Sequence, residues 1–372
     1  MQRGRRDSVA FTVVVAALVL LGGLLMAAVI ALSGAPGSLA LAALLAAIPV
    51  GPLVGCFMWL DRYEPEPRNL LLAGLLWGAF AATGAAIVFQ GISFAGGASE
   101  PETLSVVAPV TEELAKGAFL FLLLWWRRHE LDGVLDGIVY AGMVGIGFAY
   151  TENILFLAAA YDGTDGLGPG GTTALTATFV VRCLISPFAH PFFTAFIGIG
   201  VGLAIASRRT SVRLLAPLVG LLLAAFLHGV WNTSTLTGTG DFVVVYGTLM
   251  FPAFVGVVAF AVYRRRSERP MLALALQDAA DRGLLPATDI PWLVDLRARR
   301  HARRWARQQG GPLAERAMRD YQAAAIELGY LHHRYLRGTA PDDFAARGQE
   351  HVDELRRIRP YISFPGQVVP TR

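Results

Sequence analysis

The sequence contains a single lysine, Lys116, among 32 basic residues in a chain of 372. Charged residues make up 16% of the chain, whereas apolar residues make up 54%. A water-soluble domain of this length carries more charge, so this composition excludes an ordinary soluble protein. The two cysteines, Cys56 and Cys183, lie in apolar stretches and are too few for a disulfide framework. The shortage of charge therefore indicates a polytopic membrane protein.

Eight apolar segments are each long enough to cross about 30 Å of hydrocarbon as a helix. They occupy residues 9–32, 38–60, 69–94, 104–126, 134–160, 176–206, 212–235 and 242–263. The first is longer than the apolar part of a secretion signal, which favours a retained signal anchor. We expect an all-α bundle of about eight transmembrane helices in a membrane domain over residues 1–266.

Basic and non-basic loops alternate along this region. Arginines stand before the first segment and after the second, fourth, sixth and eighth, at positions Arg3, Arg5, Arg6, Arg62, Arg68, Arg127, Arg128, Arg208, Arg209, Arg213, Arg264, Arg265 and Arg266. The intervening loops have none. Because cytoplasmic loops carry the excess of Lys and Arg, both termini are predicted to be cytoplasmic. Arg182, inside the sixth segment, is the exception.

Residues 267–372 have no segment long enough to span a membrane and are rich in charge. Asp289 followed by Pro291 is typical of a helix start, and residues 315–335 have apolar positions at helical spacing. We expect a soluble helical domain on the cytoplasmic side. The arginine-rich stretch 297–307 is most simply a solvated helix face, and we expect no nucleic-acid partner.

Polar residues gather in four of the apolar segments. They are Glu112, Glu113 and Lys116 in the fourth, Glu152 and Asn153 in the fifth, His190 in the sixth, and His228 and Asn232 in the seventh. Counted from the nearest cytoplasmic charge at about 1.5 Å per residue, Glu113, Glu152, His190 and His228 all lie roughly 20–27 Å deep. Ionisable side chains at such depth mark function more often than chance. We therefore expect one polar layer in the outer half of the bilayer.

Helical spacing places Lys116 on the same face as Glu112 and Glu113, and His228 on the same face as Asn232. A buried carboxylate can take a proton from water, while His and Asn can stabilise an oxyanion. Alternatively, His190, His228 and Glu113 could hold a divalent metal such as zinc. Because the sequence lacks the His-Glu-x-x-His pattern, it leaves metal-assisted and metal-free hydrolysis open.

Five short strings carry a family resemblance. They are Glu112-Glu113-Leu-Ala-Lys116, Asp136-Gly-Ile-Val-Tyr140, Gly147-Phe-Ala-Tyr-Thr-Glu152-Asn153, Phe188-Ala-His190 and His228-Gly-Val-Trp231-Asn232. In this order they resemble the motifs of the PrsW intramembrane proteases, over most of residues 50–265. The segment Leu60-Asp61-Arg-Tyr63-Glu-Pro-Glu-Pro67 resembles a feature of actinobacterial-type members.

The resemblance implies a multi-pass peptidase of the bacterial plasma membrane, related to the type II CAAX prenyl proteases and to bacteriocin self-immunity proteins. It implies a membrane-anchored protein substrate, such as an anti-sigma factor cut on its extracytoplasmic side. It also implies a catalytic core at about residues 100–235. Glu112 or Glu113 would be the general base, His190, His228 and Asn232 polarising or ligand groups, Glu152 an assistant, and Lys116 the group that orients the glutamates.

Two other classes of function stay open at this point. Intramembrane Glu, His and Lys also build the ion relays of transporters, which would favour inverted repeats and broken helices. Neither feature is evident in the sequence. The polar layer could also serve helix packing alone, in a non-catalytic membrane scaffold or immunity protein.

Overall fold

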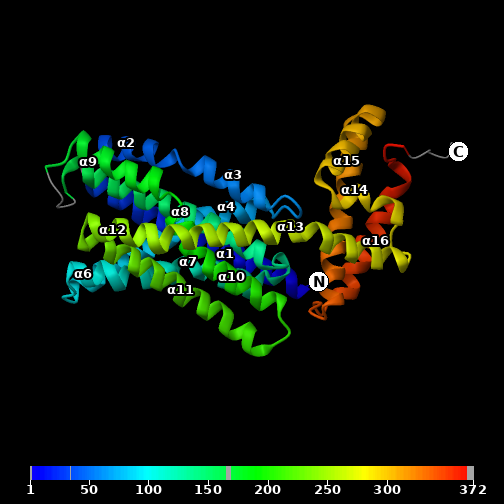
Figure 1. The fold of residues 1–372 in the computed structure, drawn as a ribbon, viewed down its shortest axis with the longest axis horizontal. Coiled ribbons are helices and arrows are strands. Elements are labelled where there is room, and N and C mark those ends of the chain that lie inside the picture. Colours follow the sequence, from blue (N-terminus) through cyan, green and yellow to red (C-terminus); the bar gives the residue numbers. More distant parts are fainter. Residues whose placement is uncertain (1, 34, 165–168, 367–372) are drawn as a thin grey trace. The chain divides into compact units, whose positions relative to one another are not determined.

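The computed structural model describes residues 2–33, 35–164 and 169–366, and side chains from residue 9 on except that of residue 33. Helices fill this described part and no strand occurs in it, which confirms the all-α prediction (Figure 1). The chain divides into two compact units. The first contains Met1–Leu60 and Glu66–Ala261, and the second contains Asp61–Pro65 and Val262–Arg372. The side chains of Arg3, Arg5 and Arg6 lie outside the described part.

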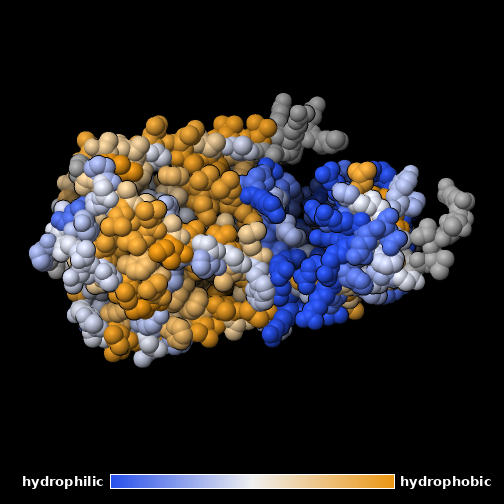
Figure 2. All heavy atoms as spheres, turned by 90° about the horizontal axis from the view of Figure 1, so that it is seen from above, coloured by the Kyte–Doolittle hydropathy of each residue, from blue (hydrophilic) through white to orange (hydrophobic). Residues whose placement is uncertain are grey.

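Helices of the first unit run back and forth along a common direction (Figure 1). In chain order they are α1 (Gln2–Ser33), α2 (Pro36–Ala47), α3 (Val50–Leu60), α4 (Arg68–Leu76), α5 (Thr83–Ala95), α6 (Glu100–Glu102), α7 (Ala108–Trp126), α8 (Val134–Asp162), α9 (Thr172–Phe179), α10 (Ala189–Ala206), α11 (Thr210–Thr237), α12 (Thr239–Val245) and α13 (Phe251–Asp281), the last of which continues into the second unit. Apolar residues cover most of the visible surface of this unit (Figure 2).

Within the residues that the structure describes, seven helical stretches are long and apolar enough to cross a membrane. They are Val9–Leu32, Pro36–Leu60, Arg68–Ala95, Val134–Asp162, Thr172–Ala206, Thr210–Thr237 and Thr239–Asp281. The fourth predicted segment, residues 104–126, also forms a helix, α7, which carries three charged residues, Glu112, Glu113 and Lys116. A polytopic bundle is confirmed, whereas the count of eight stays a prediction.

Short π-helical segments interrupt three of these stretches, at η1 (Trp77–Ala82), η4 (Val180–Ile185) and η5 (Tyr246–Met250), and a fourth segment, η2 (Thr103–Val107), directly precedes α7. Such wide turns are rare and frequently lie at functional sites. After η4 the helix breaks at residues 186–188 and restarts at Ala189. The sixth predicted segment is therefore a broken helix rather than a continuous one, and the break directly precedes His190.

Helix α8 is packed at backbone contact against α10. A Cβ atom built on Gly137 would lie 2.1 Å from the carbonyl oxygen of Gly198, and one built on Gly145 would lie 2.6 Å from Pro191. Small residues allow membrane helices to approach this closely. The approach fixes the helix of Glu152 against the helix of His190.

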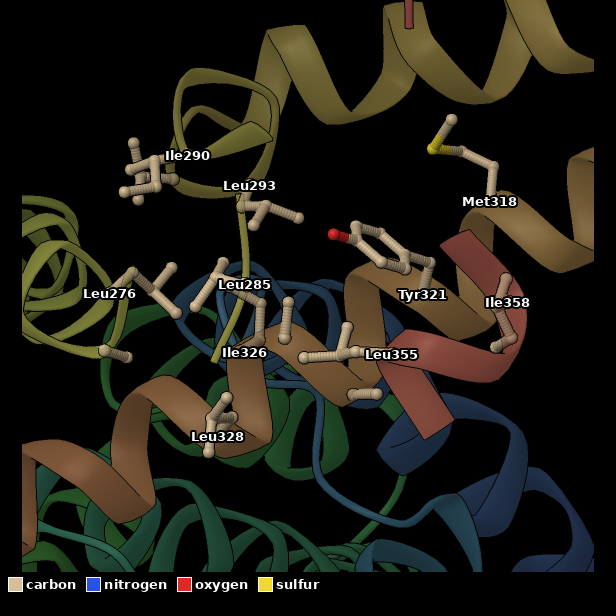
Figure 3. Packing of buried hydrophobic residues seen from close by; sticks show 14 of the residues in the cluster. Leu276, Leu285, Ile290, Leu293, Met318, Tyr321, Ile326, Leu328, Leu355 and Ile358 are labelled. Carbon is tan, nitrogen blue, oxygen red and sulfur yellow. The ribbon is translucent and has the colours of Figure 1, made fainter. Parts of the chain in front are cut away.

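The second unit has its own apolar core. It is formed by the end of α13, η6 (Ala287–Asp289), α14 (Pro291–Val294), α15 (Leu296–Leu336), α16 (Phe344–Ile358) and η7 (Arg359–Tyr361). Tyr321 lies among Leu285, Leu293, Met318 and Leu355 in this core (Figure 3). Hydrophilic residues dominate the visible surface of this unit (Figure 2). A helical domain at the end of the chain is thus present, as predicted.

A helix does start at Pro291, as predicted, but Asp289 does not cap it. No side chain caps α14, whose N-cap position is Ile290. Asp289 is instead fully buried, where its carboxylate accepts from the Tyr321 hydroxyl at 2.6 Å and from Arg359 Nε at 2.7 Å. Asp295 provides the cap of the following helix by accepting from the backbone nitrogens of Arg297 and Ala298.

A loop from between α3 and α4 also belongs to the second unit. The carbonyl oxygen of Tyr63 accepts from Nη1 of the buried Arg299 at 2.7 Å. The guanidinium groups of Arg265 and Arg299 lie 5.6 and 5.7 Å from the centre of the Tyr63 ring. The chain therefore enters the second unit at residue 61, leaves it after residue 65 and enters it again at residue 262.

Candidate active site

Four helices bring the predicted polar residues together. Helix α7 supplies Glu112, Glu113 and Lys116, α8 supplies Glu152, α10 supplies His190 and α11 supplies His228. Glu112, Glu113, Lys116, His190 and His228 are all buried. The predicted polar layer is therefore a connected cluster of side chains, reached from helices that are far apart in sequence.

Lys116 lies at the centre of this cluster. Its Nζ donates to Glu113 Oε1 at 2.7 Å and to His190 Nδ1 at 3.0 Å, and lies 3.5 Å from Glu112 Oε2. The ammonium group also lies 3.9 Å from the centre of the Phe148 ring. A buried ammonium group needs such partners, because desolvation without them is expensive. Lys116 thus links both glutamates to the first histidine.

The two adjacent glutamates differ in how firmly they are held. Glu113 accepts from Lys116, from His228 Nδ1 at 3.0 Å and from the Thr194 hydroxyl at 3.1 Å. Glu112 has longer contacts: Gln90 Nε2 at 3.2 Å, Lys116 at 3.5 Å and His228 Nε2 at 3.7 Å. A separation of 3.7 Å is too long for a direct hydrogen bond. Glu113 is saturated by its neighbours, whereas Glu112 retains acceptor capacity.

The partners of the two histidines indicate their tautomers. Because a carboxylate only accepts, Nδ1 of His228 carries a proton toward Glu113, and Nε2 of His190 carries one toward Glu152 Oε2 at 2.8 Å. His190 Nδ1 then accepts from Lys116. In its neutral form, His228 therefore presents the lone pair of Nε2 toward Glu112.

An arm of polar residues continues from His190 through Glu152. Arg182 Nη2 donates to Glu152 Oε2, and Arg182 Nε donates to Asn153 Oδ1 at 2.7 Å. The Arg182 guanidinium also lies 3.9 Å from the centre of the Phe156 ring. The sequence singled out Arg182 as an exception to the charge pattern, and the structure joins it to the cluster.

Asn232 has a different position from its predicted partners. Its side-chain amide donates to the carbonyl oxygen of Leu104 at 2.9 Å, within the π-helical segment η2. Nearby, a Cβ atom on Gly229 would lie 2.9 Å from the carbonyl oxygen of Ser105. Asn232 thus ties α11 to the segment that leads into α7, and its contacts are those of a packing residue.

Sequence reasoning missed two members of the cluster, Gln90 and Thr194. Gln90 lies on α5, in a segment with no other ionisable or amide side chain among residues 70–94, and bonds Glu112. Thr194 follows His190 by one helical turn and bonds Glu113. Thr194 could have been predicted from its spacing, because a residue four positions after His190 lies on the same helix face. A lone glutamine in a span, costly in lipid, was the signal for Gln90.

The charges of the cluster do not balance by themselves. Glu112, Glu113 and Glu152 together with Lys116 and Arg182 leave one negative charge in excess when all are ionised. In a buried site such an excess is unfavourable, so a proton or a metal cation balances it. The long contacts of Glu112 make its side of the cluster the place for that positive charge.

Glu112, His190 and His228 offer a ligand set for a metal ion, with one donor atom from each residue lying within 4.8 Å of the others. Two imidazoles and one carboxylate are a common catalytic zinc set, and the Glu113 contact to His228 Nδ1 is a typical outer-shell partner. The prediction paired the histidines with Glu113, but the atoms that gather are those of Glu112. His190 Nδ1 contacts Lys116 and His190 Nε2 contacts Glu152, so a metal at His190 would replace one of these two contacts. On that condition the chemistry of the donor set fits a metal.

Comparison with known proteins gives a consistent family match. Residues 66–259, just over half of the chain, match the family described as "PrsW family intramembrane metalloprotease". "Protease PrsW" of Geobacillus kaustophilus is 29% identical over 182 residues, which cover 48% of this chain and 73% of the relative. The proteins of the same name from Oceanobacillus iheyensis and Bacillus subtilis are 28% and 27% identical, over 41% and 55% of this chain and 63% and 85% of their own lengths. Comparison with solved structures gives no match.

Proposed function

The chain belongs to the PrsW family of intramembrane metalloproteases, and we propose that Glu112 is the general base with which it hydrolyses a peptide bond of a membrane-anchored protein. The observation that carries this proposal is the difference between the two glutamates. Glu113 is occupied by Lys116, His228 and Thr194, whereas Glu112 faces His228 Nε2 across 3.7 Å. A water molecule between these atoms could bond both of them.

In the proposed reaction, Glu112 accepts a proton from this water, and the hydroxide oxygen attacks the carbonyl carbon of the substrate. His228, protonated at both nitrogens by the charge-balancing proton, directs Nε2–H at the developing oxyanion. Glu113 holds the other nitrogen of His228. The protonated Glu112 then delivers its proton to the leaving amine, so that water is divided between the two products.

A divalent metal would be held by Glu112, His190 and His228, where it would polarise the carbonyl group and lower the pKa of a bound water. With the metal in place, Glu112 would be a ligand rather than the base, and Glu113 would keep its role of orienting His228. Lys116 orients the glutamates, Glu152 orients His190, and Asn232 fixes α11 beside α7.

We infer the wider setting from the predicted topology and the family. The chain would be a multi-pass protein of the bacterial plasma membrane, with both termini and the helical domain of residues 267–372 in the cytoplasm. The site would lie in the outer half of the bilayer, within a membrane domain of residues 1–266. A single-span anti-sigma factor is the substrate that this sidedness and the family favour. Kinship with the type II CAAX prenyl proteases would account for a glutamate base beside two histidines.

One observation favours a second candidate, an ion-coupled transporter. The break at residues 186–188 beside His190 is the kind of interruption that transporters use at their binding sites. The family match favours the peptidase. Substitution separates the two, because a transporter variant would lose transport without any change in membrane protein fragments.

The test is a quantitative comparison of membrane proteins in cells with the wild-type chain, with Glu112→Gln and with Glu113→Gln. We expect at least one single-span protein to be cut in wild-type cells and to remain intact with either variant, while both variants insert into the membrane normally. Unchanged cleavage by both variants would overturn the proposed mechanism.

A further inference from the structure

A small cavity lies beside His190. Glu112 and Glu113, the residues of α7 that Lys116 contacts, do not line it. It measures about 50 Å³. Its lining includes Asn153, Arg182, Ser186, His190 and Thr235, from α8, η4, α10, α11 and the break that precedes α10. A cavity needs roughly 10–15 Å³ by such a measure, and two to four polar partners, to hold a water molecule. This cavity meets both conditions.

Exposure decreases along the polar arm that borders the cavity. The side chain of Arg182 is 23% exposed, that of Glu152 15% and that of His190 10%, whereas Lys116 and Glu113 are at 0%. The cluster is thus sealed at its centre and opens by degrees at the Arg182 end. Within the described part of the chain, this arm is a continuous series of polar contacts from a partly exposed residue to the catalytic cluster.

The position of Arg182 argues for water rather than lipid at this opening. Arg182 is ten residues after Thr172, the first residue of α9, which corresponds to about 15 Å along a helix. A guanidinium at such depth is costly in hydrocarbon and faces a bundle interior or a water-filled space. Its Nε and Nη2 bond Asn153 and Glu152, and no described residue bonds Nη1. That group is available to a water molecule in the cavity.

The break at residues 186–188 supplies the opening itself. Ser186 bonds the carbonyl oxygen of Val181 within the last turn of η4, and Thr235 bonds the carbonyl oxygen of Asn232, so both hydroxyl oxygens still have acceptor capacity. A continuous helix would place a full turn of side chains at this point. The interruption leaves a gap that is lined by polar and apolar side chains alike.

We propose that this cavity is the entrance through which the hydrolytic water reaches the catalytic cluster from the outer aqueous phase. Arg182 and Asn153 form its polar wall and His190 its inner end, while Glu152 joins Arg182 to His190 through its carboxylate. The proposal rests on the proposed function, because only a hydrolase needs a supply of water at this cluster. It also assigns a reason for the arginine that departs from the charge pattern of the loops.

The test is cysteine accessibility in the full-length chain. In a background of Cys56→Ser and Cys183→Ala, single cysteines are introduced by Ser186→Cys and Thr235→Cys at the cavity and by Leu184→Cys as the control. Leu184 lies on the same π-helical segment as Arg182 and is 56% exposed on an apolar face. The probe is a cationic methanethiosulfonate reagent that does not cross membranes and reacts only with thiols in water.

In membranes opened so that the reagent reaches both faces, we expect the cavity cysteines to react at least 10-fold faster than Leu184→Cys. In intact cells, we expect reaction from the outside. Equal rates at the cavity and control positions would overturn the proposal, as would reaction from the cytoplasmic face alone. If Ser186→Cys does not assemble, Thr235→Cys, at an exposed position, decides the result.

Labelling distinguishes this proposal from the proposed function, because it does not depend on proteolysis. The same rates are expected when Glu112→Gln is added to each variant. Fast labelling with no substrate cleavage by the unsubstituted chain would refute the peptidase mechanism and leave the water entrance standing. Normal cleavage with slow labelling would refute the entrance alone.

Discussion

The two units each bury a carboxylate among polar partners, but they use it differently. In the second unit, Asp289 accepts from Tyr321 at 2.6 Å and from Arg359 at 2.7 and 3.1 Å. Burial and the nearby Asp289 raise the pKa of Tyr321, so its hydroxyl stays protonated and donates. In the first unit, Glu112 has no contact shorter than 3.2 Å among the described residues. A saturated buried carboxylate holds a fold together, whereas a buried carboxylate with only long contacts is available for chemistry.

The largest effect should come from removing the unsaturated carboxylate. We expect Glu112→Gln to lower the cleavage rate about 1,000-fold, in the range that general bases contribute, and to leave thermal unfolding nearly unchanged because its contacts are long. The measurement is fragment yield from a substrate found by the proteomic comparison. Glu102→Gln, at an exposed capping position outside the spans, is the matched control and should cleave normally. Full activity of Glu112→Gln would remove the distinction between the two carboxylates.

Removing the saturated carboxylate should affect folding. Asp289→Asn leaves Arg359 without its ionic partner, and we expect the second unit to lose about 3 kcal/mol of stability, the lower end for a broken buried pair because Arg359 is 29% exposed. Amide hydrogen exchange of residues 287–362 in the full-length protein measures this loss. Asp353→Asn, where the carboxylate bonds the exposed Gln349, is the control. Unchanged protection after Asp289→Asn would contradict a structural role.

Substitutions of Glu113 and Asn232 should have different effects on zinc affinity. We expect Glu113→Gln to weaken zinc binding about 10- to 100-fold, as the loss of outer-shell partners does, because His228 would lose its orienting carboxylate. Asn232→Ala should bind zinc like the wild type, since its amide bonds Leu104. The zinc retained by purified full-length protein after dialysis gives the answer by elemental analysis. Equal losses in both variants would show that the metal set depends on packing rather than on Glu113.

The smallest expected effect is a loss of stability of the second unit as the pH is lowered. Burial lowers the pKa of His333 and His351 below the ordinary 6.5. The unfolded chain therefore binds more protons than the folded one as the pH falls through 6.5, and stability decreases toward pH 5. We expect faster amide exchange near both histidines at pH 5.5 than at pH 7.5, after correction for intrinsic rates. The double substitution His333→Gln and His351→Gln should flatten this dependence, and an unaltered slope would exclude these residues as its source.

Much of the fold could be predicted from the sequence because lipid imposes simple rules. Apolar length predicted the helical stretches, and charge depletion predicted the class of protein. The break at residues 186–188 has one local signal, Pro187, which lacks a backbone N–H, but its exact position and the π-helical turns could not be read in this way. They depend on side chains from other helices, such as the Tyr246 hydroxyl that bonds the carbonyl oxygen of Ile185, and local sequence does not encode such contacts.

The membership of the polar cluster was more predictable than its internal roles. Depth counting brought Glu112, Glu113, Lys116, Glu152, His190 and His228 to one layer, since helical rise is nearly constant. The choice between Glu112 and Glu113 needed the contacts of each carboxylate, because adjacent residues on a helix point about 100° apart. Asn232 shared the depth and spacing of the cluster, yet its amide bonds a backbone carbonyl. Depth fixes a level in the membrane but not a direction around a helix axis.

Because residues 61–65 belong to the second unit, the two units cannot be separated by a single cut in the chain. A fragment that begins at residue 262 would lack Tyr63, and Arg299 would lose the carbonyl oxygen that it bonds. A fragment that ends at residue 261 would keep Tyr63 but strip it of both arginines. Neither half is therefore a faithful copy of its counterpart in the intact molecule. If the backbone were cut at residue 261, the contacts of residues 61–65 with Arg265 and Arg299 would still hold the two pieces together.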